Sequence, residues 1–163
     1  MSKHIIVLID NSYSMNIYKH NLFDSLNRMI DGHRQSQYIF SLIMFNENMT
    51  YIFKQVPFSR VKNIEEKEFE FSGMTALYDV VGNLFNELYY TLDHPTTLFI
   101  ITDGDDNNSK NYTKQNVNDM IKIGEQHAWT FIHCDTKWST LQTTYKMNFN
   151  NDNLETLFDS LTI

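Results

Sequence analysis

The chain has 163 residues, a length typical of one domain, so we expect a single domain over residues 1–163. It is 42% hydrophobic and 14% aromatic, which excludes an intrinsically disordered chain. The net charge of -7 argues against non-specific binding to nucleic acid or to an anionic membrane, because both need a basic surface.

The sequence predicts a cytoplasmic protein. Its one cysteine, Cys134, has no second cysteine to pair with and lies in the apolar run TFIHC, which indicates a buried side chain. No cleavage-site pattern follows the apolar stretch near the N-terminus. No apolar run approaches the ~18 residues that a membrane helix needs.

The first half of the chain predicts three strands and one helix. The continuous apolar run at 4–9 is typical of a buried strand, and the apolar spacing over 21–32 predicts a helix that ends at Gly32. Strands at 38–45 and 50–53 are separated by a short connection, which predicts an antiparallel hairpin. Residues 55–72 include the charged run EEKEFE and are expected to form a solvated loop.

The second half continues the alternation of helices and strands. The strongest helical pattern spans 75–92 and cannot continue through Pro95. The remaining predicted elements are a strand at 97–101, a helix at 113–128 capped by Thr113, a strand at 130–134 and a closing helix at 153–161. Residues 136–150 have no clear pattern.

Apolar strands that alternate with helices predict an α/β fold. We expect a doubly wound, mostly parallel sheet of five or six strands, with one antiparallel edge strand and helices on both faces. Ligands of such sheets bind at the carboxyl ends of the strands, where the strand order reverses. Asp10 and Asp103 each follow a predicted strand, so the two acids meet there if these strands are central.

Three stretches at this edge carry oxygen donors: DNSYS, SGMTALYD and ITDGDDNN. The candidate ligands are Asp10, Ser12, Ser14, Thr75 and Asp103. This set without nitrogen or sulfur suits a hard cation, Mg²⁺ or Mn²⁺, and argues against zinc. In extended backbone, alternation at 10, 12 and 14 would place three side chains on one side. Neutral hydroxyls leave the cation electron-poor, so that it can take a further anionic ligand.

The pattern resembles the von Willebrand factor A (vWA) domain and its metal-ion-dependent adhesion site (MIDAS), which reads Asp-x-Ser-x-Ser, then a distant Thr and a distant Asp. The matching residues are Asp10, Ser12 and Ser14, followed by Met15, then Thr75 in GMTALYD and Asp103 in ITDGDDN. Met74 stands where the family has a second glycine. The resemblance covers nearly the whole chain. It implies that the serines bind the metal directly and that the threonine and the acids bind directly or through water.

Several of these residues also have a structural interpretation. Asp10 and Ser12 alone would suit a helix cap, and Thr75 would suit a cap of the helix that follows it. Asp79 is interpreted as a surface acid favoured by the N-terminus of that helix. The acids expected at the rim of the site are Asp105, Asp106 and Asp135.

The resemblance implies a metal-dependent protein–protein interaction module, an adaptor without catalysis, that binds a Glu or Asp of a partner through Mg²⁺. Intracellular members of the family work beside AAA+ ATPases or in multi-protein complexes, so we expect such a partner. Neither nucleic acid nor membrane is expected as a partner.

An enzyme of the haloacid dehalogenase type, a Mg²⁺-dependent phosphohydrolase, is the alternative function. These enzymes place Asp-x-Asp after the first strand, whereas Ser12 occupies the second position here and cannot act as the general acid–base. The sequence also carries no Gly-rich phosphate loop. A third interpretation is a metal that only stiffens two loops.

Overall fold

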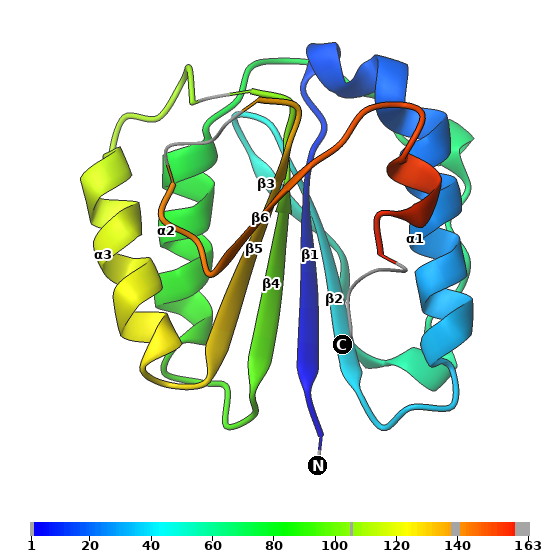
Figure 1. The fold of residues 1–163 in the computed structure, drawn as a ribbon, viewed down its shortest axis with the longest axis horizontal. Helices are drawn as coiled ribbons and strands as arrows, with labels where there is room; N and C mark the ends of the chain where they lie inside the picture. The colour runs from blue at the N-terminus through cyan, green and yellow to red at the C-terminus, as the bar shows by residue number, and fades with distance from the viewer. Residues whose placement is uncertain (1, 105, 138–140, 159–163) are drawn as a thin grey trace.

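A computed structural model of the chain describes residues 2–104, 106–137 and 141–158. Within these residues, six strands form one sheet in the order β3-β2-β1-β4-β5-β6 (Figure 1). The strands are β1 (His4–Asp10), β2 (Ile39–Phe45), β3 (Met49–Pro57), β4 (Thr96–Ile101), β5 (Trp129–Asp135) and β6 (Tyr145–Asn148). All neighbours pair in parallel except β2 and β3, which form the predicted antiparallel hairpin. The predicted sheet is confirmed.

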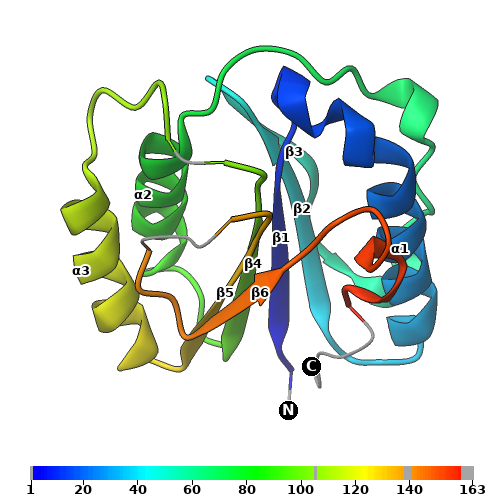
Figure 2. The ribbon, with the colours of Figure 1, turned by 45° about the horizontal axis from the view of Figure 1, so that its top comes forward.

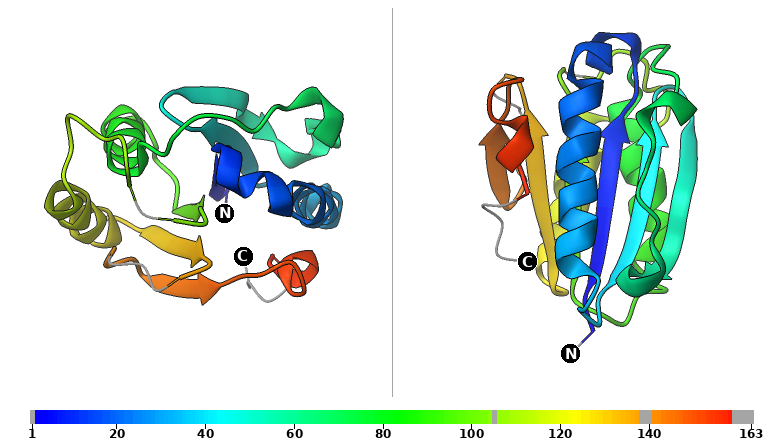
Figure 3. Two further views of the ribbon diagram at one scale, coloured as in Figure 1. Left: turned by 90° about the horizontal axis from the view of Figure 1, so that it is seen from above. Right: turned by 90° about the vertical axis from the view of Figure 1, so that its right-hand side faces the viewer.

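Helices cover both faces of this sheet, as a doubly wound fold requires (Figure 1, and Figure 3 from above). The longer helices are α1 (Lys19–His33), α2 (Leu77–Leu88) and α3 (Lys114–Glu125). Alternate residues of β1 serve the two faces: Ile5, Val7 and Ile9 pack with α1, and Ile6 and Leu8 pack with α2 and α3. Among the described residues, no helix combines the length and the apolar character that a membrane span requires.

The helices agree with some of the predictions and differ from others. Thr113 caps α3 in a capping box, in which its side chain accepts from Asn116 N and the Asn116 side chain accepts from Thr113 N. Gly32 does not end α1, which continues to His33. The predicted closing helix is represented, up to residue 158, by the short 3₁₀ helix η4 (Leu154–Thr156).

The segment between β3 and α2 is not the solvated loop that the sequence predicts. It contains two single 3₁₀ turns, η2 (Phe58–Arg60) and η3 (Glu66–Glu68), and its apolar residues enter the core on the α1 face. The buried residues are Phe58, Val61, Ile64 and Phe71. The charged run conceals this pattern, because the apolar residues follow neither the helical nor the strand period.

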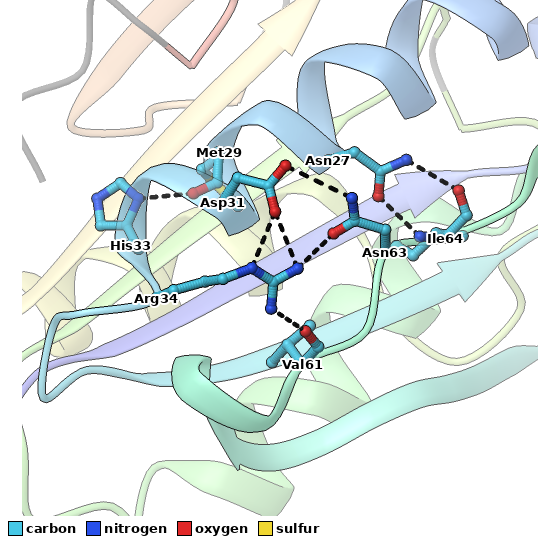
Figure 4. Close-up of polar contacts among 8 residues, drawn as sticks. All are labelled: Asn27, Met29, Asp31, His33, Arg34, Val61, Asn63 and Ile64. Atoms are coloured by element: carbon cyan, nitrogen blue, oxygen red, sulfur yellow. Dashed lines mark hydrogen bonds and ion pairs between the residues drawn. The ribbon is translucent and has the colours of Figure 1, made fainter.

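Side chains of α1 and of its C-cap residue Arg34 hold this segment in place by bonding to its backbone (Figure 4). Asn27 donates to Ile64 O at 2.8 Å and accepts from Ile64 N at 2.7 Å. Arg34 donates to Val61 O and pairs with Asp31 at 2.9 Å. An irregular segment can therefore cover the core here, because α1 satisfies the backbone groups that a helix would have satisfied internally.

Candidate metal-binding site

The predicted site residues meet at the carboxyl edge of the sheet, between the central strands β1 and β4. These two strands are neighbours, and the strand order reverses between them. Asp10 is the last residue of β1, Asp103 follows β4, and Thr75 lies just before α2. Figure 2 shows the segments that follow β1, precede α2 and follow β4 along this edge.

The inner part of the site is a buried carboxylate. Asp10 is fully buried, and its Oδ1 accepts from Ser12 N at 2.8 Å. Its Oδ2 accepts from Thr102 Oγ1 at 2.7 Å and from Thr75 Oγ1 at 3.3 Å. The carboxylate is thus fixed in one orientation. Thr102 was not among the predicted site residues, although its position directly before Asp103 was a signal that could have identified it.

The outer part of the site consists of two serine hydroxyls and a second carboxylate. Ser12 Oγ and Ser14 Oγ lie 3.3 Å apart, and Ser14 Oγ donates to Asp103 Oδ1 at 3.0 Å. Ser12 is buried, whereas Ser14 is exposed and Asp103 is half-buried. Together with Asp10 and Thr75, these groups form one continuous series of hydrogen bonds that opens to solvent at Ser14 and Asp103.

The serines converge for a different reason than simple alternation. The backbone is extended at Ser12, with φ -61° and ψ 163°, but the 3₁₀ helix η1 (Tyr13–Tyr18) begins at the next residue. Met15 N donates to Ser12 O at 3.1 Å, and the Met15 side chain is buried. The expectation of extended backbone through residue 14 was therefore wrong, and a tight turn anchored by Met15 brings Ser14 back toward Ser12.

The electrostatics of the site favour a bound cation. Burial raises the pKa of Asp10, hydrogen bonds from Ser12 and Thr102 lower it in part, and the negative charge of Asp103 raises it again. Two neighbouring carboxylates, one of them buried, are costly without a positive charge between them. The donor set of carboxylate and hydroxyl oxygens fits a hard divalent cation. Among the described residues, no group of three or more His, Cys, Asp or Glu side chains is arranged to hold a metal.

The loop after β4 binds the segment that carries Thr75. Thr75 N donates to Asn107 Oδ1 at 2.8 Å, and Thr75 O accepts from Asn107 N at 2.9 Å and from Asn108 N at 3.1 Å. The Thr75 hydroxyl points to Asp10 and does not cap α2, whose N-cap residue is Ala76. The structural interpretation of Thr75 as a helix cap was therefore wrong.

Asp79 also fixes the loop after β4 and is not a plain surface acid. Its carboxylate accepts from the backbone N–H groups of Lys110, Asn111 and Tyr112 at 2.8–2.9 Å. Desolvation would raise the pKa of Asp79, but these three bonds outweigh it and hold the pKa below its usual range. Asp79 is thus a positioning residue for the loop that begins at Asp103.

The expected acidic rim is not found among the described residues. Asp105 lies outside them. Asp106 accepts from Tyr78 N and from Ser109, so it is bound to the start of α2. Asp135 is buried and accepts from Lys137 N at 3.0 Å. The prediction that Asp106 and Asp135 line an exposed rim was wrong, because Asp106 is half-buried and bonded to Tyr78 N and Ser109, and Asp135 is buried.

Comparisons with known proteins identify the fold. No protein-family model and no curated protein sequence matches the chain. Among solved structures, proximal thread matrix protein 1 from the mussel byssus superposes with a TM-score of 0.75 at 13% identity, over 97% of this chain and 44% of that one. A von Willebrand factor type A protein from Catenulispora acidiphila gives a TM-score of 0.67 at 15% identity, over 94% and 40%. The ArnB paralog VWA2 from Sulfolobus acidocaldarius gives 0.64 at 16%, over 94% and 43%.

These similarities show that the chain has the vWA fold. The chain spans less than half the length of each of these proteins. A further structure of the mussel protein is described as having a zinc-occupied MIDAS motif. In that protein, a MIDAS motif therefore holds a divalent cation.

Proposed function

Given the vWA fold, we propose that this chain is a metal-dependent protein–protein interaction module that binds an acidic side chain of a partner through a divalent cation. One observation carries the proposal: the buried Asp10 is linked to Ser12, Ser14, Thr75 and Asp103 by a series of hydrogen bonds that reaches solvent. Oxygens that are buried at Asp10 and exposed at Ser14 can hold a cation and leave one of its coordination positions free for a partner.

Mg²⁺ or Mn²⁺ is the cation that this set of oxygens favours. The hydroxyls of Ser12, Ser14 and Thr75 would be the neutral ligands, and Asp10 and Asp103 would supply the charge. When bound, the metal supplies a Lewis-acidic position for an anionic oxygen. Two carboxylates balance the charge of a divalent cation without exceeding it, so the cation can still accept an anionic ligand. The best such ligand is the Glu or Asp of a partner protein.

The geometry gives less support to a phosphohydrolase of the haloacid dehalogenase type. In that reaction the aspartate after the first strand must reach a phosphorus atom. Asp10 is fully buried, and both of its carboxylate oxygens already accept hydrogen bonds. Ser12 stands where a general acid is needed. We therefore propose binding without catalysis.

The cellular compartment and the partner of this module are inferred from the vWA resemblance and not from the geometry. We propose that it acts in the cytoplasm as an adaptor, beside an AAA+ ATPase or within a multi-protein complex. The catalytic or motor function would then belong to the partner.

Metal binding by serine variants tests the proposal. We expect wild-type protein to bind Mn²⁺ and Mg²⁺ in isothermal titration calorimetry, and Ser12→Ala/Ser14→Ala to lose at least about 100-fold in affinity, or about 2.7 kcal/mol. Ser59→Ala is a matched control for Ser14→Ala, since both serines are exposed and lie in 3₁₀ helices. Equal Mn²⁺ affinity in the double variant and the wild type, with unchanged circular dichroism, would refute the site.

A further inference from the structure

Three exposed apolar side chains belong to the two segments that carry Ser12, Ser14 and Thr75. They are Tyr13, Ile17 and Met74, with exposed fractions of 75%, 68% and 46%, and we call them the apolar rim. Tyr13 lies between Ser12 and Ser14, and Met74 precedes Thr75. The other large apolar residues exposed in the described part of the chain are Tyr90, Ile123 and Tyr145.

Backbone contacts hold the two segments of the apolar rim side by side. Tyr13 N donates to Gly73 O at 3.3 Å, so the residues before Thr75 lie against η1. Met74 N donates to Glu47 Oε1 at 2.7 Å, and Asn108 Nδ2 contacts Met74 Sδ at 3.5 Å. Gly73 adopts a φ of 81°, which favours glycine, and a Cβ there would come within 2.6 Å of the Glu47 carboxylate. The place of Met74 is therefore set by contacts on both sides.

The turn that builds the site also directs the apolar rim to solvent. Met15 is the buried residue of η1, and Tyr18 packs against Phe149. In a 3₁₀ helix, residues three apart share one face, so Met15 and Tyr18 lie on the inner face and Tyr13 and Ile17 lie outside it. Tyr13 and Met74 directly precede Ser14 and Thr75, so a partner bound at the open end would lie beside exposed apolar side chains.

The charges around the open end favour the same kind of ligand. The described rim acids are engaged: Asp106 bonds to α2, Asp135 is buried, and the Glu47 carboxylate accepts from Met74 N. A divalent cation would balance Asp10 and Asp103. The hydrogen bonds to Glu47 and Asp106 do not remove the negative charge of these carboxylates, which would repel additional acids of a partner. One carboxylate beside an apolar side chain therefore suits this edge better than a run of acids.

We infer that the partner presents a loop in which a Glu or Asp is directly adjacent to a large apolar side chain, and that the apolar rim receives this side chain while the metal receives the carboxylate. This inference rests on the proposed function. Interface energies concentrate in a few buried aromatic and apolar anchors, so the apolar contact is worth about tenfold or more in affinity.

Labelled peptides test the inference without knowledge of the natural partner. The probes are fluorescein-labelled Gly/Ser decapeptides that contain Phe-Glu, Ser-Glu or Phe-Gln, measured by fluorescence anisotropy in saturating MnCl₂ and in EDTA. We expect Phe-Glu to bind wild-type protein about tenfold more tightly than Ser-Glu, only with Mn²⁺. Tyr13→Ala and Met74→Ala should remove this preference and leave Mn²⁺ affinity unchanged. Tyr90→Ala is the matched control, because Tyr90 is 83% exposed and lies near Pro95 and Ala128, at the opposite edge of the sheet.

The outcomes separate this inference from the proposed function. Equal binding of Phe-Glu and Ser-Glu in MnCl₂, an equal loss in Tyr90→Ala and Tyr13→Ala, or no binding of either Glu peptide would overturn the inference while calorimetry still reports the metal site. Equal binding of Phe-Glu in MnCl₂ and in EDTA, or of Phe-Gln and Phe-Glu, would overturn the proposed function itself.

Discussion

The two ends of β1 both bury a polar side chain, with opposite electrostatic consequences. At the amino end, His4 Nε2 is hydrogen-bonded to Ser41 Oγ at 2.9 Å. Burial, helped by the charge of His94, lowers the pKa of His4 to about 4, so the imidazole is neutral at pH 7. At the carboxyl end, burial raises the pKa of Asp10, and a second carboxylate lies nearby. The amino end carries a neutral ring whose Nδ1 has no hydrogen-bond partner among the described residues, whereas the carboxyl end carries a buried acid that gains from a cation.

Exposure separates the two ends as well. Ser41, the partner of His4, is buried and accepts a further bond from Gln55 N. At the carboxyl end, the series that starts at Asp10 leads to the exposed Ser14. Buried polar groups alone therefore do not mark a site in this fold. The mark of a site is a buried charge that is connected to solvent through further oxygens.

The largest expected effect tests whether the buried histidines are neutral. His4 and His133 both have a pKa lowered to about 4, chiefly by burial, against 6.5 in the unfolded chain. Between these values the unfolded chain binds more protons, so the free energy of unfolding falls as the pH falls from 6.5 toward 4. Each histidine contributes about 3 kcal/mol over the full window. Urea denaturation in EDTA at pH 7 and at pH 4.5 measures the loss.

Variants at the two histidines identify the source of this acid sensitivity. His4→Gln and His133→Leu should each make the pH dependence of unfolding shallower, because neither replacement titrates. An unchanged slope in the combined His4 and His133 variant would mean that other groups govern acid unfolding.

The second prediction concerns the charge at the carboxyl end. In wild-type protein, Mn²⁺ at about 100 times its Kd should raise the free energy of unfolding by about 2.7 kcal/mol. Asp10→Asn should abolish this rise, because an amide removes the buried charge that holds the cation. Differential scanning calorimetry with and without MnCl₂ measures both values.

The same variant should be no less stable than wild-type protein without metal. Thr102 Oγ1 lies 3.1 Å from Gly104 O, so the hydroxyl can donate there and accept from the new amide. Removal of the buried charge then offsets what the altered bonds lose. A fall of the metal-free Tm by several degrees in Asp10→Asn would show that the carboxylate supports the fold as well as the site.

The sequence predicts the sheet well because its strands are short apolar runs that a parallel core requires. β6 was not predicted, since the residues of Tyr145–Asn148 are mostly exposed and lack that pattern. The burial of Phe58, Val61, Ile64 and Phe71 was not predicted. The conformation of their segment depends on hydrogen bonds from Asn27 in α1 and from Arg34, which follows α1. Local periodicity contains no information about such contacts.

The convergence of the site residues was predicted from strand ends and the vWA resemblance, and the geometry places all five in one series of contacts. The roles of neighbouring acids were not predicted. Asp79, Asp106 and Asp135 each bind backbone N–H groups. An acid that binds backbone and an acid that faces solvent look alike in a sequence.

The smallest expected effect concerns Asp79, which orders the carboxyl edge from outside the site. Asp79→Ala removes an acceptor of three backbone N–H groups in the loop that begins at Asp103. Since the carboxylate is partly exposed, we expect a loss of only about 1 kcal/mol in the free energy of unfolding. Mn²⁺ affinity should fall by a few-fold, because Asn107 and Asn108 still bind Thr75.

Hydrogen exchange shows whether this effect is local. The amides of Lys110, Asn111 and Tyr112 should exchange faster in Asp79→Ala, while amides of β1 should be unaffected. Asp119→Ala is the control, because Asp119 is an exposed acid of α3 that accepts from the Gln115 side chain and lies away from the loop. If Asp79→Ala and Asp119→Ala gave the same exchange rates and the same Mn²⁺ affinity, the loop would be ordered by Asn107 and Asn108 alone. The loop would then keep its order without Asp79, and the charge of Asp10 with its path to solvent would remain the feature that distinguishes the two ends of β1.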